Sequence, residues 1–374
     1  MTPPASPSSQ PNSSQPSASQ PSASQPNSSQ PSEAVVAAAG ASAGRARDAD
    51  PETLLRRSVD GDRVALARML SAVERGGASG RAAAALSYRQ GHEARTVGIT
   101  GPPGAGKSTL VDRLITVARD AGMSQIGVLA VDPSSPFSGG AILGDRVRMQ
   151  GHALDDTVFI RSMASRGHLG GLALAVPESI RVLGAAGIPL VMVETVGVGQ
   201  VEVEVAAATD TTVVVLNPKW GDSVQANKAG LLETADVFVI NKADMPGSRE
   251  TRRDLEQMLD LSAPSAWRPP IIDTVASTGV GVEQLWSAVE GHQRHLDEDG
   301  NLEKRRAERL NREFRLVLSA RLQREVDRLC AEAPYSELAQ AVAEHRLDPY
   351  DAAEQFLDRA GRDSGGRGGS RNPG

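Results

Sequence analysis

Between Arg95 and about residue 291, the chain alternates short apolar runs with stretches of helical spacing. In several runs the apolar residues are consecutive, which is typical of strands covered on both faces. Alternating strands and helices predict an α/β fold with a doubly wound, mostly parallel sheet, whose ligands lie at the carboxyl ends of the strands. The predicted strands are residues 97–100, 126–131, 158–162, 190–196, 212–216, 237–240 and 271–275.

Helical regions flank this α/β domain on both sides. Before it, apolar residues at helical spacing, interrupted at Gly76 and Gly77, predict two or three short helices. After about residue 292, a long helix carries an apolar stripe crowded by arginines. The stripe can pack back onto the same chain or serve as a dimer arm, and the pattern does not choose between them. It consists of Leu310, Phe314, Leu318, Leu322, Val326 and Leu329.

The two ends of the chain have the composition of disordered tails. The first 32 residues are uncharged and repeat Ser-Gln-Pro, so they cannot bury enough apolar area to order themselves; a Pro-rich docking ligand is the alternative. This segment lacks the basic start and apolar stretch of a signal peptide. We therefore divide the chain into a tail (1–49), an N-terminal helical segment (50–92), the α/β domain (93–291), a C-terminal helical extension (292–360) and a second tail (361–374).

A complete G-x-x-x-x-G-K-[ST] phosphate loop follows the first predicted strand directly. Its glycines let backbone N–H groups turn inward, and the next helix adds the positive end of its dipole. Lys107 is predicted to bind the β- and γ-phosphates, and Ser108 to coordinate Mg²⁺. The motif therefore predicts a nucleotide-binding protein. The predicted phosphate-binding residues are Gly101, Pro102, Pro103, Gly104, Ala105, Gly106, Lys107, Ser108 and Thr109.

An N-K-x-D motif at the end of the strand 237–240 favours GTP over ATP. The Asp244 carboxylate can accept hydrogen bonds from N1–H and the 2-amino group of guanine, two donors that adenine lacks. We expect Lys242 to lay its stem along the base and Asn241 to connect this loop to the phosphate loop. The loop after the last strand is predicted to close over the base with its N–H groups. It contains Ala276, Ser277 and Thr278.

Mg²⁺ needs hard oxygen ligands, and three acidic residues follow predicted strands or a glycine-rich stretch. Glu194 ends a strand and stands where most phosphate-loop GTPases carry Asp; Asp132 and Asp145 are further candidates. Each can instead be a helix cap or a surface acid. Gln200 is positioned to orient the attacking water, as a Gln does in other GTPases. We expect Lys107, Glu194 and Gln200 to take part in catalysis.

Composition narrows the classes of partner. A net charge of -6 and 3% aromatic residues argue against nucleic acid as the main partner. The single cysteine, Cys330, excludes a cysteine-cluster metal site and is typical of a reducing cytoplasm. No apolar run reaches the length of about 18 residues needed to span a membrane. We expect a cytoplasmic protein.

Three long segments resemble the MeaB/ArgK family of P-loop GTPases. They are residues 132–149 (DPSSPFSGGAILGDRVRM), 159–172 (FIRSMASRGHLGGL) and 193–200 (VETVGVGQ), and the resemblance covers about residues 50–350. Members of that family are GTPase chaperones of methylmalonyl-CoA mutase and related adenosylcobalamin-dependent acyl-CoA mutases. They gate cofactor loading and protect or reactivate the mutase. The resemblance implies hydrolysis of GTP to GDP, with Mg²⁺, at a rate that rises in the mutase complex.

The resemblance also implies a homodimer built through the C-terminal helices, and a segment after the strand 212–216 that responds to the partner. Here that segment reads Pro218-Lys219-Trp220-Gly221-Asp222, where the family usually has Pro-Gly-x-Gly-Asp. Lys in place of Gly restricts the backbone. Lys228 matches a basic position in the same segment, which implies contact with the active site of its own subunit or a partner.

Several alternatives stay open at this point. The client can be a methylmalonyl-CoA, isobutyryl-CoA or ethylmalonyl-CoA mutase. A nickel-insertion metallochaperone shares the Glu-bearing motif, but one cysteine and scattered histidines supply no ligand cluster. A transport-protein kinase of the ArgK type lacks support from any kinase motif. A GTP-dependent scaffold with little hydrolysis is the last alternative.

Overall fold

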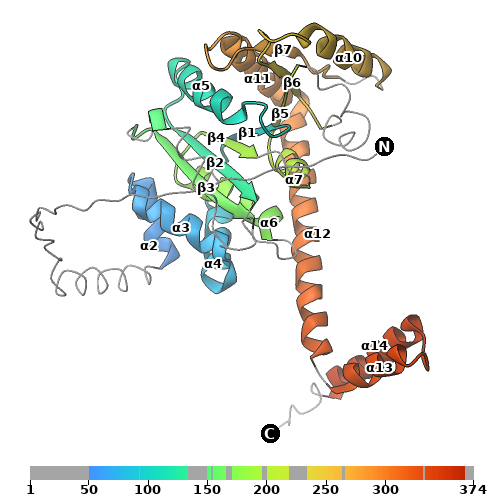
Figure 1. The fold of residues 1–374 in the computed structure, drawn as a ribbon. Coiled ribbons are helices and arrows are strands. Elements are labelled where there is room, and N and C mark those ends of the chain that lie inside the picture. Colours follow the sequence, from blue (N-terminus) through green and yellow to red (C-terminus); the bar gives the residue numbers. More distant parts are fainter. Residues whose placement is uncertain are drawn as a thin grey trace, which may run out of the picture. The chain divides into compact units, whose positions relative to one another are not determined.

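The computed structural model describes residues 50–91, 93–133, 150–152, 155–165, 171–195, 200–218, 234–262, 266–331 and 333–366. Within these ranges, helices and strands alternate as the sequence predicts (Figure 1). The strands are β1 (Arg95–Thr100), β2 (Ile126–Pro133), β3 (Val158–Ser165), β4 (Leu190–Thr195), β5 (Thr211–Leu216), β6 (Val237–Asn241) and β7 (Ile271–Thr274). The main helices are α2 (Pro51–Val59), α3 (Arg63–Arg75), α4 (Gly77–Gln90), α5 (Lys107–Asp120), α6 (Gly171–Ala185), α7 (Gln200–Ala208), α10 (Ser248–Leu261), α11 (Val282–Asp297), α12 (Asn301–Cys330), α13 (Ala333–Ala343) and α14 (Pro349–Gly366).

The described strands form one parallel sheet of order β3-β2-β4-β1-β5-β6-β7. The predicted fold class is confirmed, and each predicted strand has its counterpart. The strand order switches at β1: strands β2, β3 and β4 lie on one side of it, and β5, β6 and β7 lie on the other. In such sheets the crevice beyond the carboxyl ends of the strands at this point is where ligands bind. The phosphate loop lies there, between β1 and α5.

Helices cover both faces of the sheet, which explains why the strands are apolar at consecutive positions. On β5, Val213 and Val215 belong to a core cluster that includes residues of α5 and α11. Val214 and Leu216 point to the opposite face and pack with residues of β6 and α10. Helices α6 and α7 contact β4, and α6 also contacts β3.

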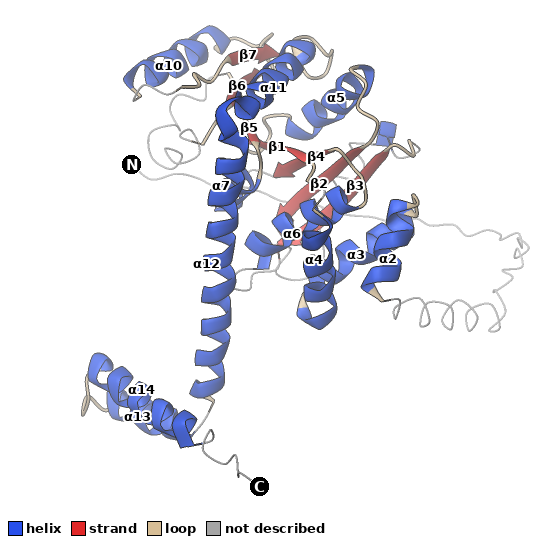
Figure 2. Cartoon of the chain, turned by 180° about the vertical axis from the view of Figure 1, so that it is seen from behind, coloured by secondary structure: helices blue, strands red, loops and turns tan. Residues whose placement is uncertain are grey.

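The N-terminal helices α2, α3 and α4 pack together on α6 and at the edge of the sheet (Figure 2). Helices α2 and α3 are capped by Asp50 and Asp62, whose carboxylates accept amide N–H groups of the first turn. Strand β3 is an edge strand, and its Arg161 donates to the Ala67 carbonyl and pairs with Glu74 at 2.6 Å. The helical segment therefore shields an edge that could otherwise pair with another chain.

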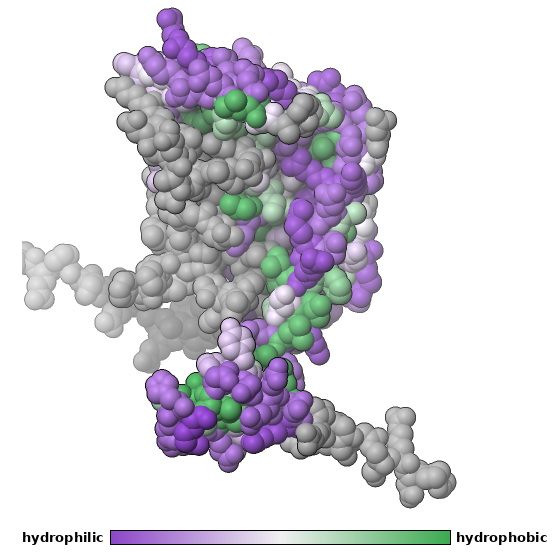
Figure 3. Space-filling view, turned by 90° about the vertical axis from the view of Figure 1, so that its right-hand side faces the viewer, coloured by the Kyte–Doolittle hydropathy of each residue, from purple (hydrophilic) through white to green (hydrophobic). Residues whose placement is uncertain are grey.

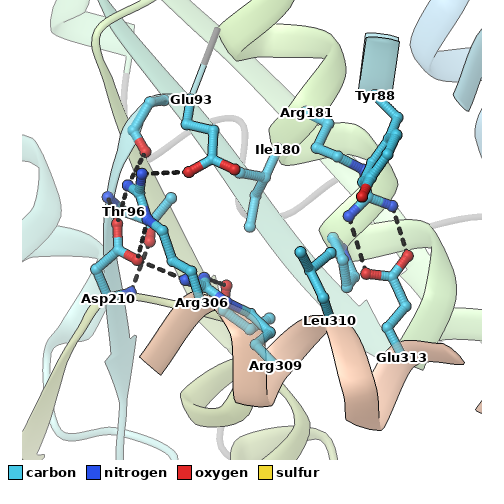
Figure 4. A pocket seen from close by; sticks show the side chains of 13 residues that line it. Tyr88, Glu93, Thr96, Ile180, Arg181, Asp210, Arg306, Arg309, Leu310 and Glu313 are labelled. Atoms are coloured by element: carbon cyan, nitrogen blue, oxygen red, sulfur yellow. Dashed lines mark hydrogen bonds and ion pairs between the residues drawn. The ribbon is translucent and has the colours of Figure 1, made fainter. Parts of the chain in front are cut away.

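Buried ion pairs connect helix α12 to the segment just before strand β5 (Figure 4). Asp210, which precedes β5 and is fully buried, pairs with Arg306 at 2.9 Å and with Arg309 at 2.5 Å. Arg181 of α6 pairs with Glu313 at 2.5 Å. These residues border a cavity of about 60 Å³ at the end of the strands opposite the phosphate loop. Arg306 and Arg309, two of the arginines around the stripe, therefore hold α12 against the α/β domain.

The apolar stripe of α12 divides into two parts. Leu310 lines the cavity beside α6, so the start of the stripe packs on the same chain. Phe314, Leu318, Leu322 and Val326 are 65%, 45%, 58% and 44% exposed. Figure 3 shows green, apolar surface on this side of the molecule, between the α/β domain and helices α13 and α14. Of the two interpretations of the stripe, packing on the same chain therefore does not account for Phe314, Leu318, Leu322 and Val326.

Two predicted boundaries differ from the elements that the structure contains. The break between residues 291 and 292 falls inside α11, because Gly291 is accommodated within a helix that continues to Asp297. Helix α14 continues to Gly366, beyond the predicted start of the tail at residue 361. Extending an existing helix by a turn costs much less than starting one, so composition alone misplaced this end.

Candidate nucleotide site

The phosphate loop requires glycine at two positions where other chain segments approach closely. Gly101 has φ 137°, and a Cβ there would overlap the Val215 carbonyl of the neighbouring strand. Gly106 has φ 90°, and a Cβ there would overlap the Asn241 side-chain amide. Both residues adopt backbone conformations that side chains disfavour. The loop can therefore wrap tightly in front of helix α5, at the helix N-terminus, where the helix dipole favours an anion.

Lys107 and Ser108 begin α5 and are buried, at 5% and 6% exposure. The Lys107 ammonium donates to the carbonyls of Gly101 and Pro102, at 2.8 and 2.9 Å, so it lies directly across the loop. This places the positive charge where the sequence predicts the β- and γ-phosphates.

Ser108 donates its hydroxyl hydrogen to Oε1 of Glu194 at 2.5 Å. Glu194 is buried in β4 and pairs in register with Ile99 of β1 and Ala130 of β2, so the sheet fixes its position. A hydroxyl and a carboxylate at this separation are hard oxygen ligands of the kind that Mg²⁺ prefers. The residues present therefore fit a magnesium ion, which Ser108 and Glu194 would hold.

Asn241 connects the segment that carries the N-K-x-D motif to the phosphate loop. Its Nδ2 donates to the Ala105 carbonyl at 2.7 Å, and its Oδ1 accepts from the Thr274 hydroxyl and the Ala276 N–H, each at 3.1 Å. Lys242 follows with φ 59°, and its ammonium donates to the Gly104 carbonyl at 2.8 Å. The N-K-x-D motif thus connects its own loop to the phosphate loop and to the loop after β7.

A pocket of about 310 Å³ lies between these loops, with the exposed carboxylate of Asp244 at its border. Ala276 and Ser277 line the pocket, whereas Thr278 donates its N–H to the Val275 carbonyl, which closes the turn. Sequence reasoning missed Met245 and Val275 as lining residues, and it missed Arg113, whose guanidinium holds the loop from α5. Arg113 lies on α5, far in sequence from the loop at 276–278, so the motif of that loop gives no indication of this contact. The lining residues are Gly106, Thr109, Asn241, Lys242, Asp244, Met245, Val275, Ala276 and Ser277.

Several predicted residues fall outside the described part of the chain. Asp145, Lys228 and residues 219–222 of the atypical segment lie there. Asp132 and Gln200 are described only by their backbones, at the end of β2 and the start of α7. Their predicted roles stay predictions. Within the described residues, no group of three or more His, Cys, Asp or Glu side chains could hold a metal ion, and no helix is long and apolar enough to cross a membrane.

Residues 66–331 match the family model described as methylmalonyl-CoA mutase-associated GTPase MeaB. The chain belongs to the MeaB family of P-loop GTPases. The resemblance noted in the sequence is therefore confirmed. Family membership implies guanine nucleotide binding in general terms.

Three relatives illustrate the relationship. A putative GTPase of Pyrococcus abyssi is 45% identical over 82% of this chain and 95% of its own length. The mitochondrial methylmalonic aciduria type A homolog of Mus musculus is 37% identical over 56% of this chain and 52% of that protein. Among solved structures, the crystal structure of an LAO/AO transport system kinase has a TM-score of 0.61 at 27% identity, covering 83% of this chain and 97% of that one.

Proposed function

We propose that this MeaB-family member hydrolyses GTP to GDP and phosphate as a chaperone of an adenosylcobalamin-dependent acyl-CoA mutase, with methylmalonyl-CoA mutase as the first candidate. In this proposal it acts in the cytoplasm, gates cofactor loading and protects or reactivates the mutase. The observation that carries the proposal is the family match over residues 66–331, because the segments outside the nucleotide motifs match as well. The name of the mouse relative refers to methylmalonic aciduria, which supports methylmalonyl-CoA mutase as the client in this proposal.

The residues of the site suit GTP hydrolysis. Asp244 would accept guanine N1–H and the 2-amino group, while the phosphate-loop amides and Lys107 would neutralise the phosphates. Ser108 and Glu194 would hold Mg²⁺. When bound, that ion supplies positive charge that stabilises the transferring phosphoryl group. Gln200 and Lys228 are proposed, from the sequence, to orient water and to contact the active site; Asp132 and Asp145 are proposed to assist with the metal.

Stimulation by the client tests the chaperone function. We expect GTP turnover to rise at least about tenfold when the purified chain is mixed with its cognate mutase, since charge-stabilising groups supplied by a partner contribute factors of that size or larger. Phosphate release is measured with methylmalonyl-CoA, isobutyryl-CoA and ethylmalonyl-CoA mutases in turn. An adenosylcobalamin mutase that acts on an amino acid is the control. No response to any acyl-CoA mutase would contradict the proposal.

We also propose that the protein is a homodimer that buries the exposed part of the α12 stripe. A glutamate in place of Leu322, which is 58% exposed, would put a charge into the apolar contact. The expected result is a dimer dissociation constant raised at least about tenfold, because burying one leucine contributes about 1.5 to 3 kcal/mol. Sedimentation equilibrium measures it. Gln323→Glu adds the same charge about 100° around the helix and is expected to leave the dimer intact.

Single-turnover GTP hydrolysis, with and without a mutase, separates this function from a GTP-dependent scaffold, which would bind GTP without cleaving it. One observation favours a second candidate: the structural relative at 27% identity is named as a transport system kinase. Radiolabel transferred from γ-labelled GTP to a transport protein would support that candidate. The metallochaperone alternative has no ligand cluster among the described side chains, and equilibrium dialysis with Ni²⁺ tests it across the whole chain.

A further inference from the structure

Arg113 lies on α5, the helix that begins at the phosphate loop, and its guanidinium reaches the base-binding loop. Nε donates to the Ala276 carbonyl at 3.3 Å, and Nη2 donates to the Ser277 carbonyl at 3.1 Å. The planar guanidinium presents its N–H groups in one fixed plane, whereas the donors of an ammonium group rotate. Two consecutive peptide groups of the loop are thus held from the side of α5.

The other hydrogen bonds of this loop determine which amide is left for a ligand. The Ala276 N–H donates to Asn241 Oδ1, and the N–H groups of Thr278 and Gly279 both donate to the Val275 carbonyl at 3.0 Å. Within the described residues, Ser277 is the one position from 276 to 279 whose N–H has no acceptor. Ser277 also lines the pocket of about 310 Å³.

Peptide geometry links Arg113 to that amide. The carbonyl of Ala276 and the N–H of Ser277 belong to one planar trans peptide and point in opposite directions. Because the Ala276 carbonyl accepts from Arg113, the Ser277 N–H points away from the Arg113 guanidinium. Ala276 and Ser277 line the pocket of about 310 Å³, whereas Arg113 is not among its lining residues.

We propose that Arg113 is a positioning residue for base specificity, which holds the loop so that the Ser277 N–H donates to O6 of guanine. Adenine carries an amino group at this position, and two donors facing each other would leave both without an acceptor. The 6-position is thereby read separately from the N1–H and 2-amino group, which face Asp244. This inference rests on the proposed guanine nucleotide binding and deepens it.

A comparison of nucleotides tests the proposal. Dissociation constants for GDP, 6-thio-GDP and IDP are measured by competition with fluorescent GDP, for the wild type and for Arg113→Met, which keeps the aliphatic stem. Sulfur is a weak acceptor, so we expect the wild type to bind GDP several-fold more tightly than 6-thio-GDP. In Arg113→Met this ratio is expected to fall by about threefold or more, since a single hydrogen bond is lost. The ratio of GDP to IDP, which reports on the 2-amino group, is expected to stay unchanged.

Arg119 provides the matched control, because it also lies on α5 and donates to two carbonyls, those of Met123 and Ser124, away from the pocket. Arg119→Met is expected to change neither nucleotide ratio. A GDP to 6-thio-GDP ratio that is the same in Arg113→Met as in the wild type would overturn the proposal, as would equal losses for all three nucleotides. If the wild type binds no GDP, the proposed nucleotide function itself fails, which the same titration detects.

Discussion

Lys107→Ala is expected to lower GTP turnover by about 100- to 1000-fold, the usual effect of removing one donor that stabilises transition-state charge. The ammonium lies across the phosphate loop, 2.8 Å from the Gly101 carbonyl, and Lys107 as a whole is 5% exposed, so no solvent ion replaces it easily. Phosphate release at saturating GTP and Mg²⁺ measures the effect. Because the interaction strengthens in the transition state, turnover should fall more than GTP affinity.

The control for this variant is Lys304→Ala, which removes a lysine from the exposed surface of α12. It is expected to retain wild-type turnover. If Lys107→Ala keeps turnover within about tenfold of the wild type while remaining folded, the assignment of Lys107 to the phosphates is wrong.

Asp210→Ala is expected to destabilise the fold by about 3 to 5 kcal/mol, because it leaves the partly buried guanidinium of Arg309 without its carboxylate partner, while Arg306 retains its pair with the exposed Glu93. Asp210 also accepts the Thr96 N–H at 3.1 Å, so it joins α12 to the start of β1 (Figure 4). Urea unfolding followed by circular dichroism measures the change. The exposed pair of Asp260 and Arg268 supplies the comparison, and Asp260→Ala is expected to cost less than about 1 kcal/mol. Equal effects for the two variants would contradict this account.

The same carboxylate makes stability depend on pH. Burial alone would raise the pKa of Asp210, but hydrogen bonds and charge from Arg306 and Arg309 outweigh burial and lower the pKa to about 2. A lowered folded-state pKa stabilises the fold at a pH above the unfolded value of about 3.9, and this contribution, about 2 to 3 kcal/mol, is lost as pH falls toward 2. The difference in unfolding free energy between wild type and Asp210→Asn should shrink over that range.

Local motifs predicted a phosphate loop and a base-binding loop, and the structure brings these two segments together around one pocket. The segment 101–108 combines a strand end, glycines and a helix start, and the geometry of such a loop is determined within a few residues. The same holds for Asn241 and Asp244, because a strand end positions both. Apolar runs predicted the seven described strands for a similar reason: a strand buried on both faces has a distinctive composition.

Contacts between distant segments could not be predicted in this way. Arg113 was one of many surface arginines until the fold brought α5 next to the loop at 276–277. The arginine cluster of α12 gave no indication that Arg306 and Arg309 would neutralise Asp210, about a hundred residues earlier in the chain. Periodicity likewise left the stripe of α12 undivided, whereas the structure covers Leu310 and exposes Leu322.

The sequence by itself determined that this protein has a parallel α/β sheet, a phosphate loop, a guanine-type motif and a MeaB-like chain, because each depends on residues close together or on long specific segments. The tertiary structure decided which amide of the base loop is left for a ligand, which charges are buried together, and which part of α12 is exposed. These depend on how segments far apart in the chain pack against one another. A pattern read along one segment contains no information about the partner that the fold brings to it.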